Sequence, residues 1–152
     1  MNKTVYNTLD IAFRDITTFG GAIFYGGVVL FSFILGQQML ARQLLLGFVF
    51  TLCITIIIRL LYFRNRPQKQ EFHNLLERID AASFPSLHTS RVVFLTGMGI
   101  SSFQNSFITL FLIVFAALVI YSRIYLQKHD WIDVIGGIVV GMGTYWGIVH
   151  LL

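Results

Sequence analysis

The sequence predicts an all-α membrane protein, a polytopic helix bundle of about five transmembrane helices preceded by an N-terminal interfacial helix. Of the 152 residues, 56% are hydrophobic and only 12% are charged, whereas a soluble domain carries roughly 25% charged residues. The mean hydropathy of +0.75 indicates the same class. Charge-free stretches long enough to cross a bilayer also recur along the chain.

Each predicted spanning helix falls in one of these charge-free stretches. A span needs roughly 20 mostly apolar residues, so residues 16–41, 43–58 and 134–152 each suit one helix. The stretch 92–122 is too long for one helix, and its polar interruption at 101–106 divides it into two. The five expected spans are residues 17–38, 43–63, 87–103, 106–126 and 131–151.

Two other segments are expected to lie on the membrane surface. Residues 1–15 are too polar to span, but their apolar residues can form an amphipathic turn or two in the interface. The connection 68–83 is expected to be an amphipathic helix over the site, because apolar residues recur there at helical spacing with charges between them. These apolar residues are Phe72, Leu75, Leu76 and Ile79. The helix either guides a lipid headgroup into the site or is an ordinary interfacial anchor.

The chain is predicted to form one domain, since no repeat, low-complexity segment or linker divides it. A cleavable signal peptide is not expected, because no basic segment, short apolar core and small-residue cleavage site follow one another near the start. The single cysteine, Cys53, has no partner for a disulfide. We expect it to pack inside the bundle.

The basic residues are predicted to gather on one side of the membrane. Up-and-down helices place the N-terminus and the connections 64–86 and 127–130 on that side, and ten of the eleven Lys and Arg residues fall there. The positive-inside rule accounts for basic loops at a cytoplasmic face. It does not account for Arg59, which lies inside an apolar span, where an ionisable residue is a functional candidate.

Arg59 and Arg66 are candidate phosphate ligands. They are seven residues apart, which would place both guanidiniums on one helix face. A planar guanidinium donates paired hydrogen bonds to phosphate oxygens and stays charged. The pair therefore indicates an anion site at the membrane boundary.

A histidine and an aspartate at the start of the last span form a second cluster. His129 and Asp133 are four residues apart, so the carboxylate can hold one imidazole nitrogen and leave the other free to attack or to accept a proton. Taken alone, such a histidine is more often a capping or interfacial residue, and Asp130 and Asp133 can simply complement the helix N-terminus. Ser86 is a plausible N-cap, which leaves His88 unexplained.

Together these clusters resemble the three-part signature of the type 2 phosphatidic acid phosphatase superfamily, which includes membrane lipid phosphatases and soluble vanadium haloperoxidases. The signature is a lysine, six residues and Arg-Pro; then Pro-Ser-Gly-His; then Ser-Arg, five residues, His, three residues and Asp. The matching segments are Arg59 to Pro67, Pro85-Ser86-Leu87-His88, and Ser122-Arg123 with His129 and Asp133. Each part is weak alone, but all three in order are a specific signal over residues 59–133.

The sequence departs from the family pattern at two positions. Arg59 replaces the lysine, which keeps the charge but exchanges a point charge for a broader fork. Leu87 replaces the glycine, and we expect a helical leucine still to donate its backbone N–H. The family's usual six spans are also reduced to five here, with residues 1–15 in place of the first.

The resemblance implies hydrolysis of a lipid phosphate or diphosphate through a phosphohistidine, with no metal and no cofactor. His129 would be the nucleophile, Asp133 would orient it, and His88 would act as general acid and then as base. The phosphoryl oxygens would be held by Arg59, Arg66, Arg123, Ser86 and the backbone N–H of Leu87. Arg91 is either a further phosphate contact or a structural partner of Asp80, Asp130 or Asp133.

Three functions stay open at this point. The first is a phosphatase acting on a prenyl diphosphate, phosphatidylglycerophosphate, phosphatidate or lipid A phosphate. The second is phosphotransfer from one lipid to another acceptor, and the third is a non-catalytic protein that binds anionic lipids through its arginines. The expected partners are a lipid substrate and the bilayer, not nucleic acid. The charge count favours a cytoplasmic site, whereas the resemblance favours the extracytoplasmic face of the cell membrane, which we adopt as the prediction.

Overall fold

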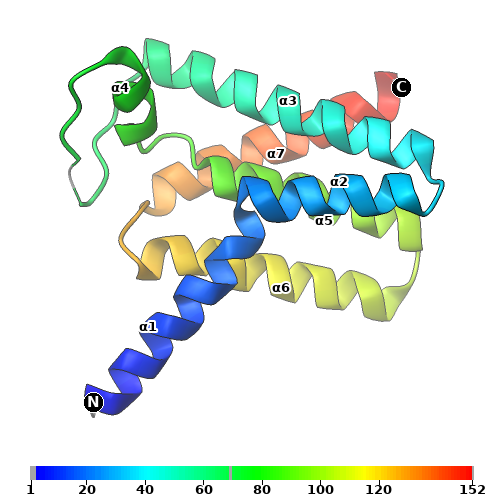
Figure 1. Cartoon of the computed structure of the whole chain (residues 1–152), viewed down its shortest axis with the longest axis horizontal. Coiled ribbons are helices and arrows are strands. Elements are labelled where there is room, and N and C mark those ends of the chain that lie inside the picture. The colour runs from blue at the N-terminus through cyan, green and yellow to red at the C-terminus, as the bar shows by residue number, and fades with distance from the viewer. Residues whose placement is uncertain (1–2, 69, 152) are drawn as a thin grey trace.

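The computed structural model describes residues 3–68 and 70–151, which form helices and no β-strand (Figure 1). Residues 1, 2, 69 and 152, which include parts of the predicted interfacial segment and of the 68–83 connection, lie outside this description. The elements are α1 (Lys3–Thr17), the 3₁₀ turn η1 (Thr18–Gly20), α2 (Ala22–Ile34), α3 (Gln38–Leu61), α4 (Leu75–Ala81), α5 (Leu87–Phe103), α6 (Ser106–Tyr125) and α7 (Trp131–Leu151). The predicted all-α membrane bundle is confirmed.

Three of the described helices are long and apolar enough to cross a membrane alone, namely Gln38–Leu61, Ser106–Tyr125 and Trp131–His150. Part of α1 together with α2 meets the same criterion as one broken span, with a bend of 49° between them. In Figure 1, α1 leaves the bundle obliquely and lies beside α6, against which it packs. The interfacial position of residues 1–15 stays a prediction.

The first predicted span is too long, since α2 covers only Ala22–Ile34 of the expected residues 17–38. The helix begins after Gly21, whose φ of −78° and ψ of 161° are extended. It ends at Ile34, two residues before Gly36, whose φ of +75° favours glycine. There the N–H groups of Gly36 and Gln37 donate to the carbonyls of Phe33 and Ser32, both at 3.0 Å, which closes the helix in a Schellman turn.

The core of the bundle lies between α2, α3, α5 and α7. Its buried members are Tyr25, Leu44, Phe94, Met98 and Ile148. The Tyr25 hydroxyl donates to the Leu44 carbonyl at 2.7 Å, so this phenol is satisfied while its ring stays buried.

Helices α5 and α7 approach each other closely at two glycines four residues apart. A Cβ atom at Gly137 would lie 2.6 Å from the Ser86 carbonyl oxygen, and one at Gly141 would lie 2.6 Å from that of Ser90. Small residues at this spacing let membrane helices pack backbone to backbone. This contact fixes the start of α5 against the start of α7, where the candidate site lies.

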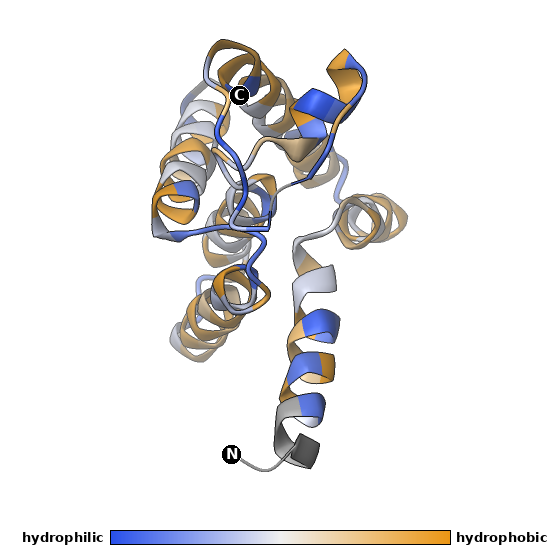
Figure 2. Ribbon diagram, turned by 90° about the vertical axis from the view of Figure 1, so that its left-hand side faces the viewer, coloured by the Kyte–Doolittle hydropathy of each residue, from blue (hydrophilic) through white to orange (hydrophobic). Residues whose placement is uncertain are grey.

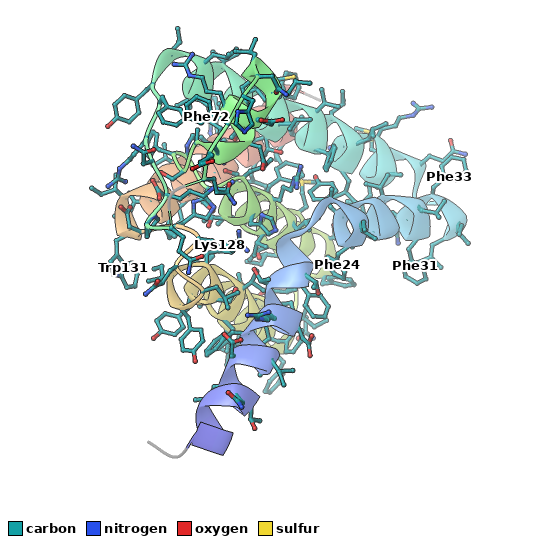
Figure 3. The ribbon with its side chains drawn as sticks, turned by 60° about the vertical axis from the view of Figure 1, so that its left-hand side comes forward. Phe24, Phe31, Phe33, Phe72, Lys128 and Trp131 are labelled. Carbon is teal, nitrogen blue, oxygen red and sulfur yellow. The ribbon has the colours of Figure 1, made fainter. Side chains whose placement is uncertain are left out.

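The outer faces of the helices are apolar. Phe24, Phe31 and Phe33 are exposed and point away from α2 (Figure 3). Cys53 is also exposed on α3, so the expectation that it packs inside the bundle is wrong. An apolar outer face is what a helix presents to lipid.

The connection between α3 and α5 is helical only over α4, so the helix predicted for residues 68–83 is too long. Asn74 caps α4, because its Oδ1 accepts the N–H of Glu77 at 2.8 Å. Figure 1 places α4 and the 126–130 connection at the same end of the bundle. Seen from that end, the connecting loops and parts of α1 and α4 are hydrophilic, whereas the long helices are mainly hydrophobic (Figure 2).

Candidate active site

The residues of the three motifs all lie at this hydrophilic end, because each motif stands at a helix boundary there. Arg59 is in the last turn of α3 and Arg123 in that of α6. Ser86 precedes α5, and His129 and Asp133 lie at the start of α7. The structure therefore gathers residues that are up to about half the chain apart in sequence.

A Schellman turn at the end of α6 positions His129 beside Arg123. Gln127 has a φ of +53°, and the Lys128 N–H donates to the Arg123 carbonyl at 3.0 Å. The His129 N–H reaches the same carbonyl at 3.2 Å. The chain thus folds back on α6, and the His129 side chain is buried, with 3% of its surface exposed.

Asp130 and Asp133 cap the first turn of α7 reciprocally. Asp130 Oδ1 accepts the N–H groups of Ile132 and Asp133 at 3.0 and 3.1 Å, and Asp133 Oδ2 accepts the Asp130 N–H at 3.0 Å. This is the arrangement of a capping box with aspartates in both positions. The helix-terminus role considered for both residues is therefore confirmed.

Asp133 also faces the nucleophile candidate. Its fully buried carboxylate places Oδ2 3.6 Å from His129 Nδ1, a distance longer than a hydrogen bond. No group in the described part of the chain bonds this buried Nδ1. The structure therefore brings His129 and Asp133 together, as predicted. The carboxylate faces Nδ1 and not the other imidazole nitrogen, Nε2.

Burial lowers the pKa of His129, the Asp133 carboxylate raises it, and the charges of Arg123 and Arg66 lower it. The net shift is downward. A downward shift favours the neutral imidazole at neutral pH, which is the form that can act as a nucleophile.

Arg59 and Arg66 do not share a helix face, because α3 ends at Leu61 and Arg66 lies in the loop beyond it. That part of the sequence argument is wrong. Their guanidiniums still converge, because the loop folds back: Arg59 donates to the carbonyls of Ile79 at 3.0 Å and Pro85 at 3.1 Å. Arg66 donates to a carbonyl of the same segment, that of Asp80. Both arginines hold residues 79–85 against the bundle.

Arg123 is buried, and its Nη1 donates to Thr17 Oγ1 at 2.7 Å. It lines a polar cavity of about 600 Å³ whose other walls come from α1, from Gln68 and from the α6–α7 connection, including Lys128 (Figure 3). Arg66 is close enough for its charge to act on Arg123. In the described residues, the buried Nε atoms of Arg59, Arg66 and Arg123 have no hydrogen-bond partner.

The second motif forms the start of α5. Ser86 is its N-cap as predicted: its Oγ accepts the Thr89 N–H at 3.5 Å and the Thr89 hydroxyl at 3.0 Å. The Ser86 N–H donates to the Asp133 carbonyl at 2.9 Å, which links α5 to α7. Leu87 is the first residue of α5 and has no positive φ. Its backbone N–H therefore stands in the first turn, where helical donors lack intrahelical partners.

His88 is half-buried one position further along α5. Its charge would interact with those of Arg123, Arg91, His129 and Arg66, so it belongs to the same cluster. A Cβ atom at the buried Gly20 would lie 3.0 Å from His88 Cδ2. The joint between α1 and α2 therefore packs directly on this histidine.

Arg91 is buried, and its guanidinium lies 4.7 Å from the centre of the Phe48 ring. The structure does not pair Arg91 with any of the three aspartates considered as its partners. Asp80 pairs with Arg66, Asp130 pairs with Arg64, and Asp133 pairs with Arg64 and His129. A phosphate contact by Arg91 stays a prediction. The described residues contain no group of three or more His, Cys, Asp or Glu side chains placed to hold a metal ion, and metal-independent chemistry likewise stays a prediction.

The sequence argument missed three side chains of the site. Arg64 and Ser83 both contact Asp133, and Thr17 binds Arg123. Arg64 stands inside the first motif, two residues before Arg66. No local spacing connects any of these three with its partner, so only the fold shows the contact.

The chain belongs to the PAP2 superfamily, whose sequence profile matches residues 40–152. This confirms the resemblance drawn from the three motifs. The fold is similar to the crystal structure of Aquifex aeolicus LpxE, with a TM-score of 0.78 over 94% of this chain and 86% of that one, at 24% identity.

A curated relative is the undecaprenyl-diphosphatase BcrC of Bacillus subtilis, 35% identical over 92 residues. The match covers 60% of this chain and 47% of BcrC, so the chain spans about half the length of this relative.

Proposed function

We propose that this chain hydrolyses a lipid phosphate or diphosphate, without a metal, through a phosphohistidine at His129. The observation that supports it most is the buried His129, with Nδ1 toward Asp133 and with Arg66 and Arg123 close enough to act on its charge. Among the substrates considered, a prenyl diphosphate comes first, because the relative BcrC is named for undecaprenyl diphosphate.

In the first step, Nε2 of neutral His129 attacks the terminal phosphorus, and the bond between phosphorus and the leaving oxygen breaks. His88 donates a proton to that oxygen, so that a lipid phosphate or alcohol departs. The imidazolium formed on His129 keeps its proton on Nδ1, where Asp133 faces it at 3.6 Å. Hydrogen bonds of this kind are often long in an empty site and tighten when substrate binds.

In the second step, His88 accepts a proton from water, whose oxygen attacks the phosphorus and releases inorganic phosphate from His129. Both steps concentrate negative charge on the phosphoryl oxygens, and fixed positive charge stabilises it. The buried Nε donors of Arg59, Arg66 and Arg123 are without protein partners in the described residues. The N–H of Leu87 and the hydroxyl of Ser86 complete the proposed set of donors.

The test is phosphate release by the purified protein in detergent with EDTA, across a panel of prenyl diphosphates, phosphatidate and phosphatidylglycerophosphate. His129→Ala is expected to lose at least about 10³-fold in kcat, as removal of a nucleophile does. The matched control is His150→Ala, since His150 is exposed in the last turn of α7, at the other end of that helix. Undiminished activity of His129→Ala would refute the proposal.

The same panel separates the alternatives. Free inorganic phosphate indicates hydrolysis, whereas a phosphorylated second lipid with no free phosphate indicates a phosphotransferase. A non-catalytic binder yields neither product.

We also propose that the site faces the extracytoplasmic side of the membrane, as in the prediction from the motifs. A cysteine placed at Gln70 should then react with a membrane-impermeant reagent added outside intact cells. Cys53 must be removed first, because it is exposed on α3.

A further inference from the structure

Arg64 is an arginine of the site end to which neither the motifs nor the proposed mechanism gives a role. Its Nη1 donates to Asp130 Oδ1 at 2.8 Å and to Asp133 Oδ1 at 2.9 Å, and its Nη2 lies 2.6 Å from Asp130 Oδ2. One guanidinium therefore bridges the two carboxylates that follow His129 in sequence. The contact ties the loop after α3 to the first turn of α7, across 66 and 69 positions of sequence.

The two carboxylate oxygens of Asp133 have different partners. Oδ1 accepts from Arg64 and from the Ser83 hydroxyl at 3.1 Å. Oδ2 accepts the Asp130 N–H at 3.0 Å and faces His129 Nδ1 at 3.6 Å. The carboxylate of Asp133 is fully buried. It forms ion pairs with Arg64 at 2.9 Å and with His129, when protonated, at 3.6 Å, and its charge also acts on Arg59 and Arg66.

We propose that Arg64 is a positioning residue, which holds Asp133 facing His129 and offsets its charge so that the imidazole stays neutral between turnovers. The inference rests on the proposed function in one respect, that His129 attacks as a neutral base. A carboxylate without a counter-ion at this distance would stabilise the imidazolium. A protonated histidine has no lone pair on Nε2 with which to attack phosphorus.

Two other arginines around His129 act in the same direction as Arg64. Arg123 from α6 and Arg66 from the loop after α3 both disfavour a positive imidazole, and His88 from α5 lies close enough for its charge to interact with that of His129. Asp133 from α7 is the group that favours it. Removal of Arg64 leaves these neighbours and the hydrogen bonds from Ser83 and the Asp130 N–H in place, but removes the cation that bonds Asp133 directly.

The test compares Arg64→Gln and Arg64→Lys with Arg42→Gln, an exposed arginine on α3 near its opposite end. The readouts are the pH profile of kcat/KM and an NMR titration of the His129 ring in detergent, with its resonance assigned through His129→Gln. In Arg64→Gln, the acidic limb of the profile and the pKa of His129 should both rise by about one unit. The loss of activity is then larger at pH 6 than at pH 8.

Arg64→Lys should keep the acidic limb in place, because the charge remains. Its kcat should fall about tenfold, since an ammonium cannot reproduce the planar fork that bridges both carboxylates. Arg42→Gln should change neither quantity. If Arg64→Gln fails to fold, Arg64→Lys carries the test, and an unchanged kcat in that variant overturns the inference.

The inference is also overturned if Arg64→Gln loses the same factor of activity at every pH and the acidic limb of its pH profile does not move. A purely structural bridge would give that result. The NMR titration separates this failure from failure of the proposed function. A chain that releases no phosphate but whose His129 pKa rises in Arg64→Gln refutes the phosphatase and leaves the role of Arg64 standing. Normal phosphate release by the wild type, together with an unchanged pKa of His129 in Arg64→Gln, refutes the role of Arg64 and leaves the phosphatase standing.

Discussion

The two ends of the bundle are built by different kinds of contact. At the end opposite the site, the α2–α3 turn is closed by Gly36 and the α5–α6 turn by Gln104 and the cap Asn105. The hydrogen bonds of these turns join residues no more than five positions apart. At the site end, the bonds of Arg59 and Arg64 join residues 20 to 69 positions apart. The two turns are specified locally, whereas the contacts of Arg59 and Arg64 form only once the helices have assembled.

This difference predicts that substitutions in the cluster of buried site residues change chemistry and that substitutions in the turns at the other end change stability alone. After His129→Ala, the largest effect is expected for His88→Ala. Loss of a general acid lowers kcat about 10²- to 10⁴-fold on an alkyl phosphate. The loss should be far smaller on p-nitrophenyl phosphate, whose leaving group departs without a proton.

The control for His88→Ala is His73→Ala, an exposed histidine in the connection before α4 at the same end of the bundle. It should retain full activity on both substrates. If His88→Ala lowered kcat by the same factor on both substrates, His88 would not be the general acid. The contribution of His88 would then be electrostatic.

A smaller effect is expected where the N-terminal joint meets the site. In Gly20→Ala, the new methyl group would lie 3.0 Å from His88 Cδ2 and 3.1 Å from His88 Cβ, so the imidazole must shift by a few tenths of an ångström. Because catalysis is sensitive to displacements on this scale, kcat should fall about tenfold. The measurement is kcat in detergent beside the melting temperature.

Gly27→Ala is the matched control, because a Cβ atom there meets nothing within 4 Å. Wild-type kcat in Gly20→Ala at an unchanged melting temperature would show that the α1–α2 joint does not position His88. The joint would then be packing only, and the contribution of the N-terminal segment to the site would be limited to contacts such as that of Thr17 with Arg123.

The same contrast explains which parts of the fold the sequence predicted. The bounds of α5 and α7 agree with the predicted residues 87–103 and 131–151, because apolar stretches and local caps such as Ser86 determine them. The 17–38 helix failed at Gly21 and Gly36, where backbone conformation and not hydropathy decides. The 68–83 helix is shorter at both ends than predicted. It begins only after the cap Asn74, and it ends before Ser83, whose N–H and hydroxyl donate to the carbonyls of Arg64 at 2.8 Å and Asn65 at 3.1 Å.

The site was predicted to the extent that it is local. The four-residue spacing of His129 and Asp133 sufficed to pair them, and the structure places them 3.6 Å apart. Arg64 was missed because its two partners are 66 and 69 positions away. Arg59 and Arg66 do converge, but through a loop that folds back onto residues 79–85 and not through a shared helix face.

The smallest effect is expected at the opposite end, in Asn105→Ala. Asn105 Oδ1 accepts the N–H groups of Phe107 and Ile108 at 3.0 and 3.1 Å. Loss of such a cap costs about 1 kcal/mol of stability, so the melting temperature should fall while kcat per folded molecule stays unchanged. Ser86→Ala removes the equivalent cap at the site end and should lower both quantities, because Ser86 is also a proposed phosphate ligand. A fall in kcat for Asn105→Ala would mean that the two ends of the bundle are coupled, because the Asn105 side chain bonds residues of α6 at the end away from His129.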